Sequence, residues 1–276
     1  MNTRELFQAV MNFKPFDRLP LLEWAAWWDK TIERWHAEGL PSNVTDRYDI
    51  CRHFGLDIYK QDWFAVCRPD CPSPKSHGSG IIENESDYDA LRKFLYPPCP
   101  VDRKRWEQWA GEQKKGEIVL WFSVDGFFWF PRKLLGIERH LYSFYDQPRL
   151  VHRINSDLTE WILRVIDQVC AICFPDFMSF GEDLSYNHGP MLSKPLFDEF
   201  LLPYYKKVIP RLKEMTMNKG EAAMRAEFER LLPTAAKGGF LPSCDHQTPP
   251  GVSYKDYRLY VSLFQEYAQK AGRMSE

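Results

Sequence analysis

Residues 118–124, Ile-Val-Leu-Trp-Phe-Ser-Val, form a short apolar run that is typical of a buried β-strand. Further along, residues 146–169 place apolar side chains at spacings of three and four. With Asp146 as the N-cap and Pro148 in the first turn, this pattern predicts an amphipathic helix. The helix leads directly into a second strand-like run, residues 176–181. The order strand, helix, strand predicts a β-α-β unit with parallel strands.

The same alternation extends over the rest of the chain. Further strand-like runs at 19–23, 57–59 and 240–243 are each followed by loop residues and a helical pattern. A (β/α)8 barrel takes about 250 residues. The 276 residues of this chain therefore fit a single barrel domain, 1–276. Pro, Ser and Gly are frequent at 67–79 and 96–100, so we expect the segment 67–117 to hold lids or excursions from the repeating units.

Charge and hydropathy exclude two classes of partner. The 36 Lys and Arg residues nearly balance the 38 Asp and Glu residues, which leaves a net charge of −2. No stretch has the clustered Lys and Arg that nucleic acid or an anionic membrane would require. The sequence around Met1 lacks the apolar run of a signal peptide, and no segment approaches a membrane span of about 18 apolar residues. We expect a cytoplasmic protein.

The seven cysteines are an odd number at irregular spacing, which favours reduced thiols over a disulfide scaffold. Cys170 and Cys173 form a CxxC pattern at the end of an apolar helical stretch, where packing is favoured over redox or zinc chemistry. Cys67 and Cys71 have no second matching pair, so a zinc knuckle there is favoured still less.

In parallel α/β folds the active site lies at the carboxyl ends of the strands. Aromatic residues make up 15% of this chain, and several of them stand next to carboxylates after the predicted strands. A carboxylate among tryptophans has a raised pKa and can serve as a general acid or hold a ligand cation. The alternative is that the tryptophans pack a helix and the carboxylate caps it. The candidates are Glu23, Asp62, Trp27, Trp28, Phe128 and Trp129.

Two later loops are richer in polar side chains. Residues 181–190 contain Glu182, Asp183, Tyr186 and His188, which supply acid, base and hydrogen-bonding groups in one loop. Alternatively, Asp183 caps the loop. In the second loop, residues 243–250, Cys244 and His246 would supply two of the four ligands of a tetrahedral zinc, although two ligands alone do not define a site.

These loops resemble the uroporphyrinogen decarboxylase family, which includes the heme-pathway decarboxylase and the corrinoid-linked methyltransferases. Residues 4–20 look like the family's opening helix and first strand. Residues 181–193, Gly-Glu-Asp-Leu-Ser-Tyr-Asn-His-Gly-Pro-Met-Leu-Ser, and their continuation to 206 are similar to its central loop and helix. Residues 238–252, with Cys-Asp-His-Gln-Thr-Pro-Pro at 244–250, look like its final strand and the loop bearing a functional histidine.

The resemblance implies a (β/α)8 barrel with a deep cleft for a tetrapyrrole or a methyl-bearing substrate. Asp183, Tyr186 and His246 would contact the substrate, supported by the carboxylates Glu23 and Asp62. Glu182 and His188 would help to bind it, and the apolar walls would be Trp27, Trp28, Phe128 and Trp129. For the methyltransferase branch the resemblance further implies zinc, held by Cys244 and His246, and a corrinoid or a corrinoid protein as partner.

Two departures shape the functional expectation. Decarboxylases of the family carry an arginine-rich loop after the first strand, which binds the propionate groups of the substrate. This chain has Glu-Trp-Ala-Ala-Trp-Trp at 23–28 instead and lacks these arginines. The helical pattern 193–214 also runs through 215–219 almost directly into a later helix of the family. The barrel is therefore predicted to be shorter by two to three β-α units after residue 214, at about 30 residues a unit.

Together these features favour a methyltransferase-like or uncharacterised branch of the family that acts on a methyl-bearing small molecule or a corrinoid. One alternative is uroporphyrinogen decarboxylase itself, a lyase of tetrapyrrole (porphyrin) biosynthesis. The other is a non-catalytic binding or scaffold relative with an incomplete barrel, which would cover its open strand edges by pairing with a second copy as a homodimer.

Overall fold

The computed structural model describes residues 1–217, 253–255, 257, 258, 261 and 265. The chain divides into two compact units. The first contains Met1–Lys60, Trp109–Leu120 and the described residues after 252, and the second contains Gln61–Gln108 and 121–217. The single domain 1–276 stays a prediction, as does the short connection near 215–219, part of which lies outside the described residues.

The first unit contains the helices α1 (Thr3–Met11), α2 (Asp29–Glu38) and α3 (Arg47–Phe54). Local sequence sets their ends: Asn2 and Glu5 form a capping box at α1, and Asp46 caps the backbone of α3. Gly55 ends α3 in the left-handed conformation, which glycine adopts without a Cβ clash.

An ion pair organises the segment that leads into the first strand. Asp57, which is 8% exposed, accepts hydrogen bonds from both terminal nitrogens of Arg18, at 2.6 and 2.8 Å, and from the Leu21 backbone at 2.7 Å. The predicted strand at 19–23 is therefore wrong: Leu21 lies in irregular backbone held by Asp57. The predicted strand at 57–59 instead begins at Tyr59, so Asp62 lies within this strand rather than after it.

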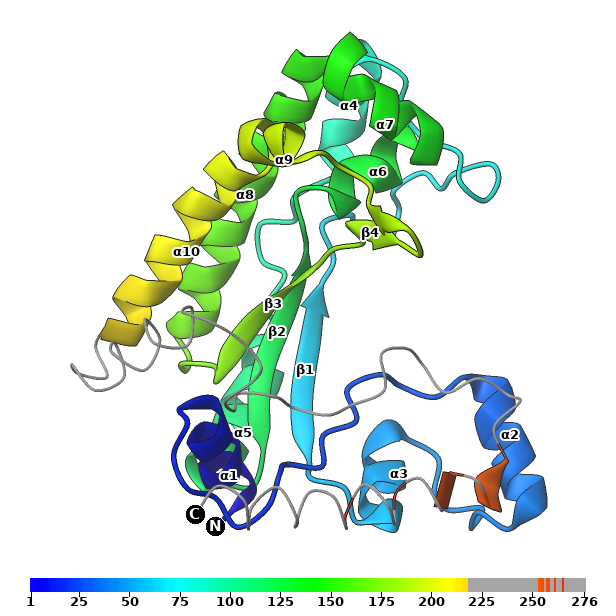
Figure 1. The fold of residues 1–276 in the computed structure, drawn as a ribbon, viewed down its shortest axis with the longest axis vertical. Helices are drawn as coiled ribbons and strands as arrows, with labels where there is room; N and C mark the ends of the chain where they lie inside the picture. The colour runs from blue at the N-terminus through cyan, green and yellow to red at the C-terminus, as the bar shows by residue number, and fades with distance from the viewer. Residues whose placement is uncertain (218–252, 256, 259–260, 262–264, 266–276) are drawn as a thin grey trace. The chain divides into compact units, whose positions relative to one another are not determined.

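The predicted mixed α/β fold with parallel strands is confirmed. Strands β1 (Tyr59–Phe64), β2 (Val119–Asp125) and β3 (Phe177–Gly181) form a parallel sheet in the order β1-β2-β3 (Figure 1). The register pairs Trp121 with Phe177 and Asp125 with Gly181. The described strands do not close into a barrel.

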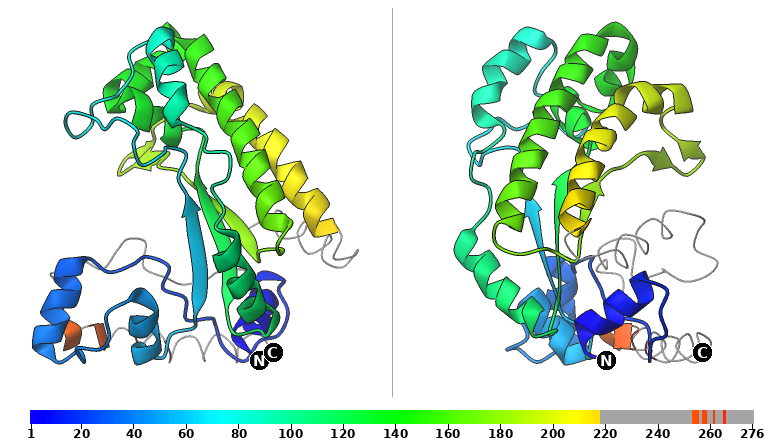
Figure 2. Two further views of the ribbon diagram at one scale, coloured as in Figure 1. Left: turned by 180° about the vertical axis from the view of Figure 1, so that it is seen from behind. Right: turned by 90° about the vertical axis from the view of Figure 1, so that its left-hand side faces the viewer.

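Helices of the second unit pack beside the sheet. The predicted helix between β2 and β3 is confirmed as α8 (Pro148–Cys170), and it runs beside α10 (Leu202–Met217) (Figures 1 and 2). The predicted helix at 193–214 is divided into α9 (Lys194–Phe200) and α10, with Pro203 in the first turn of α10. The shorter elements are α6 (Trp129–Leu135), α7 (Ile137–Asp146) and a hairpin of β4 (Ser185–Tyr186) and β5 (Gly189–Pro190).

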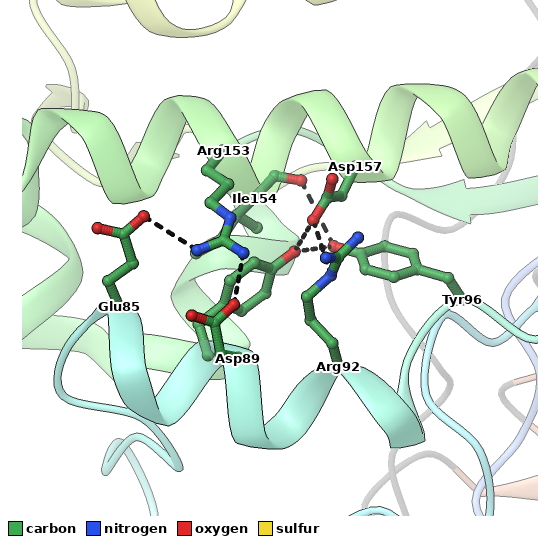
Figure 3. Close-up of polar contacts among 8 residues, drawn as sticks. Glu85, Asp89, Arg92, Tyr96, Arg153, Ile154 and Asp157 are labelled. Carbon is green, nitrogen blue, oxygen red and sulfur yellow. Dashed lines mark hydrogen bonds and ion pairs between the residues drawn. The ribbon is translucent and has the colours of Figure 1, made fainter.

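The expected excursion contains α4 (Glu85–Leu91), the 3-10 helix η1 (Arg92–Phe94) and α5 (Arg103–Lys114). Figure 3 shows how α4 and η1 are attached to α8. Arg153 pairs with Glu85 and Asp89, and Arg92 pairs with Asp157. Tyr88 is fully buried beneath these pairs and donates its hydroxyl to Asp157 at 2.9 Å. This part of the excursion is thus fixed to α8.

We expect Tyr88→Phe to lower the free energy of unfolding by about 2 kcal/mol, because it removes a buried hydrogen bond to a carboxylate. Tyr142→Phe is the matched control, since Tyr142 is 59% exposed. Urea denaturation followed by circular dichroism measures both changes. Equal stability of the two variants would contradict the role assigned to Tyr88.

Candidate functional site

One face of the sheet carries a row of polar side chains. Gln61 donates to Ser123 at 2.9 Å, and Ser123 shares a hydrogen bond with Ser179 at 2.7 Å, so the row crosses all three strands. On the opposite face Phe122 packs against Phe64. Because side chains alternate along a strand, the next residues on the polar face stand at the carboxyl ends of the strands.

Asp125 is the centre of this carboxyl edge. Asp125 is 3% exposed. Its carboxylate accepts hydrogen bonds from the indole nitrogen of Trp63 at 3.2 Å and from Lys133 Nζ at 2.8 Å. Trp63 itself is 48% exposed, so its ring forms an accessible wall beside the carboxylate. Gly181, opposite Asp125 in the register, makes room for this ring: a Cβ at 181 would lie 2.4 Å from Trp63. Asp125, Trp63 and Lys133 are called the edge cluster below.

Glu182 follows β3 and binds the start of α6. Its carboxylate accepts from the backbone nitrogens of Phe128, at 3.1 Å, and Trp129, at 2.8 Å, and from the hydroxyl of Tyr205. Burial raises the pKa of Glu182, while the hydrogen bonds from Tyr205 and the backbone oppose this shift. Gly126 is required beside it, because a Cβ there would lie 2.1 Å from the carboxylate. Glu182 therefore positions α6 and the residues it carries.

The other residues of the predicted loop 181–190 are more exposed. Asp183 pairs with Arg132 at 3.5 Å, and its side chain is 62% exposed. Tyr186, in β4, is 56% exposed, and its ring lies 5.8 Å from that of His188. Asp183 is thus linked to α6 by its ion pair with Arg132. Tyr186 and His188 lie together on the exposed hairpin.

Two further candidates, Asp62 and Phe128, contact other side chains of the protein. Asp62 accepts from Arg105 and from the indole of Trp106 at 3.0 Å, and it alternates along β1 with Gln61 and Trp63 of the polar face. Phe128 is fully buried and packs on His140, with 4.7 Å between ring centroids. Both placements favour a role in packing over contact with a substrate.

A cavity of about 440 Å³ lies beside the edge cluster. Trp129, Arg132 and Lys133 of α6 line one side, and the loop containing Cys67 and Arg68 lines the other. The guanidinium of Arg132 lies 4.9 Å from the Trp129 ring centroid. This volume is typical of pockets for small molecules, about 300–1,000 Å³. Lys133 belongs both to the cavity wall and to the edge cluster.

The remaining candidates lie elsewhere. Glu23 is fully buried in the first unit, where Trp27 packs against Trp35 and Trp28 is 49% exposed. The zinc candidates Cys244 and His246 lie outside the described residues. Within the described part of the chain, no group of three His, Cys, Asp or Glu residues could hold a metal ion. A zinc site therefore stays a prediction that depends on Cys244 and His246.

The sequence does not single out Lys133 and Tyr205, whereas Asp125 and Trp63 follow predicted strands but are not among the selected site residues. Asp125 and Trp63 carried an available signal, since each stands at the carboxyl end of a strand and shares its face with a polar residue two positions earlier. Tyr205 and Lys133 carried none, because their contacts depend on how α10 and α6 pack against the sheet.

His140 is a fully buried histidine beneath the site, and neither ring nitrogen meets a partner with hydrogen-bond geometry. Burial, with a smaller effect of the Arg132 charge, lowers its pKa to about 3, although the nearby Phe128 backbone opposes this shift. The unfolded chain takes up this proton at about pH 6.5, so stability falls as pH falls from about 6.5 towards 3.

We expect His140→Phe to reduce the stability lost between pH 7 and pH 5 by about 2 kcal/mol. The exposed His77 provides the matched control, His77→Phe, which should keep the slope of the wild type. Urea denaturation at several pH values measures the slope. An unchanged pH dependence in His140→Phe would show that His140 titrates normally in the folded protein.

Comparison with known proteins adds no assignment: no protein-family model matches the chain, and no curated protein gives a significant match. Among the described residues, no helix combines the length and hydropathy needed to cross a membrane.

Proposed function

We propose that this chain is an enzyme of the uroporphyrinogen decarboxylase family, in a methyltransferase-like branch, and that the edge cluster is its active site. The observation that carries the proposal is the position of Asp125 and Trp63 at the carboxyl edge of a parallel sheet, where Lys133 pairs with Asp125 and also lines a cavity. A (β/α)8 barrel shortened after residue 214 and a cytoplasmic location belong to the same proposal.

The cavity supports a small substrate. At about 440 Å³ it lies towards the lower end of the range for small-molecule pockets, which favours a methyl-bearing small molecule over a tetrapyrrole. Trp129 provides a flat apolar wall, as a small aromatic or methylated compound would require.

The residues of the site define the chemistry they can perform. Asp125 can accept a proton or a hydrogen bond from the reacting group, while Lys133 places a positive charge next to it. The indole of Trp63 fixes the orientation of the Asp125 carboxylate. A corrinoid, when bound, would carry the methyl group.

Uroporphyrinogen decarboxylase remains the second candidate because two arginines, Arg68 and Arg132, line the cavity. Guanidinium groups bind carboxylates well. Each of the two already pairs with an aspartate, Arg68 with Asp70 at 3.2 Å and Arg132 with Asp183 at 3.5 Å. A substrate carboxylate would compete with both aspartates for these guanidinium groups, which makes this candidate the weaker one.

A methyl-transfer assay tests the proposal. The purified chain is mixed anaerobically with a reduced corrinoid and a panel of O-methyl, N-methyl and S-methyl compounds, and the visible spectrum of the corrinoid is followed. We expect at least one compound to change the spectrum only when the protein is present. Conversion of uroporphyrinogen to coproporphyrinogen without any methyl transfer would establish the decarboxylase instead. Neither activity, together with an obligate dimer on size-exclusion chromatography, would favour a non-catalytic relative.

A further inference from the structure

Cys67 and Cys71 stand at the two ends of a short, well-anchored turn. The Cys71 nitrogen donates to the Arg68 carbonyl at 3.0 Å, which closes the turn between them. The Arg68 nitrogen donates to Phe94 at 2.8 Å, and Cys67 forms a β-bridge with Leu95. The backbone at Cys67 and Cys71 is therefore held in place by the fold.

The turn brings Cys67 and Cys71 close enough for the Cys71 side chain to contribute to the raised pKa of Cys67. Both are free and half-buried, and both line the cavity of about 440 Å³ beside the edge cluster. Neither has a metal-binding environment, because no group of three ligands exists among the described residues. Two neighbouring free thiols without a metal are the arrangement from which a disulfide forms.

We propose that Cys67 and Cys71 are a redox-active dithiol that forms a reversible disulfide in the wall of the cavity. The oxidant is a low-molecular-weight disulfide. The Cys71 thiolate attacks one sulfur of the oxidant, breaks its S–S bond and releases one thiol. Cys67 then loses its proton and attacks the Cys71 sulfur of the mixed disulfide, which releases the second thiol. The protein loses two protons and two electrons, and the oxidant becomes two thiols.

The order of attack follows from the surroundings of Cys67. Burial, with the neighbouring Cys71 as a second cause, raises the pKa of Cys67 to about 12, while the charge of Lys133 opposes the shift. A thiol with so high a pKa is a poor first nucleophile, so Cys71 reacts first and Cys67 resolves the mixed disulfide.

Peptide mapping provides the test. The folded protein is equilibrated with reduced and oxidised glutathione, quenched by alkylation, digested with trypsin and analysed by mass spectrometry. Pro69 blocks cleavage after Arg68, so residues 61–75 form one tryptic peptide with Cys67 and Cys71 as its only cysteines. The disulfide appears as the loss of two hydrogen atoms from this peptide and the loss of both alkylation sites. A synthetic peptide of residues 61–75 is the unfolded reference.

We expect the disulfide to be favoured at least about tenfold more in the protein than in the synthetic peptide, because the fold holds the thiols together. Cys67→Ser should leave Cys71 as a stable mixed disulfide with glutathione, whereas Cys71→Ser should leave Cys67 unmodified. The exposed Cys99 serves as the internal control and should form only a mixed disulfide. An equal or smaller preference in the wild-type protein, or glutathione retained on Cys67 or Cys71 of the wild type, would overturn the proposal.

Discussion

Replacing Glu182 by alanine is expected to lower the free energy of unfolding by about 3 kcal/mol, since three donors, two of them at the start of a helix, lose their acceptor. The donors are the backbone nitrogens of Phe128 and Trp129 and the hydroxyl of Tyr205. Burial raises the pKa of Glu182, so the charge itself is held unfavourably. The expected loss therefore comes from the unsatisfied donors and the space left behind, rather than from a lost ion pair.

Glu182→Gln separates these contributions. The glutamine keeps an acceptor oxygen and nearly the same volume, so we expect it to lose only about 1 kcal/mol. Urea denaturation of both variants, followed by circular dichroism, gives the comparison. If Glu182→Ala proved as stable as the wild type, Glu182 would not position α6, and direct contact with a substrate would again be the better interpretation of this residue.

Replacing Asp125 by asparagine is expected to lower the rate of the proposed methyl transfer by about 100-fold, the size of effect seen when a catalytic acid or base is removed. Asparagine has nearly the same shape but only one acceptor oxygen, so it can keep the hydrogen bond from Trp63 or the one from Lys133 but not both, and circular dichroism shows whether the fold persists. Asp167→Asn is the matched control, because Asp167 is half exposed on α8 and pairs with Arg211.

The outcome separates two interpretations of the site. A loss confined to Asp125→Asn, with unchanged circular dichroism, supports the edge cluster. A loss confined to Asp183→Asn would instead favour the residue that the family resemblance selects. Full activity in Asp125→Asn would exclude its carboxylate from the reaction.

The sequence predicts β2, α8 and β3 well because their signals are local. Strand β2 is buried along its whole length and the helical period of buried positions persists from one end of α8 to the other, so each element is recognisable without knowledge of its neighbours. The prediction fails near residues 19–23, where an ion pair between Arg18 and Asp57 decides the backbone. These partners are 39 positions apart, beyond the reach of any periodicity.

The candidate site, too, is predictable where the signal is local and unpredictable where it depends on residues far apart in the chain. Carboxyl ends of strands are the right place to look, yet the carboxylate there that lies on the polar face is Asp125, whereas Asp62 faces α5. The predicted strand 57–59 leaves Asp62 in a loop, whereas β1 extends to Phe64, so alternation along the strand decides the face of Asp62. Glu182 shows a second limit, because the backbone nitrogens it caps lie 54 and 53 positions earlier in the chain.

The central claim is that substrate binds at the edge cluster, and the indole proton of Trp63 reports on it directly. This N–H donates to Asp125, whereas the indole N–H of Trp161 donates to the Pro97 carbonyl. In ¹H–¹⁵N spectra, with the Trp63 signal assigned by Trp63→Phe, the methylated compound that gives the fastest transfer is titrated into the protein. We expect a shift of the Trp63 signal with the Trp161 signal unmoved. Saturable shifts confined to the indoles of Trp24, Trp27 or Trp28, with Trp63 unmoved, would contradict the claim.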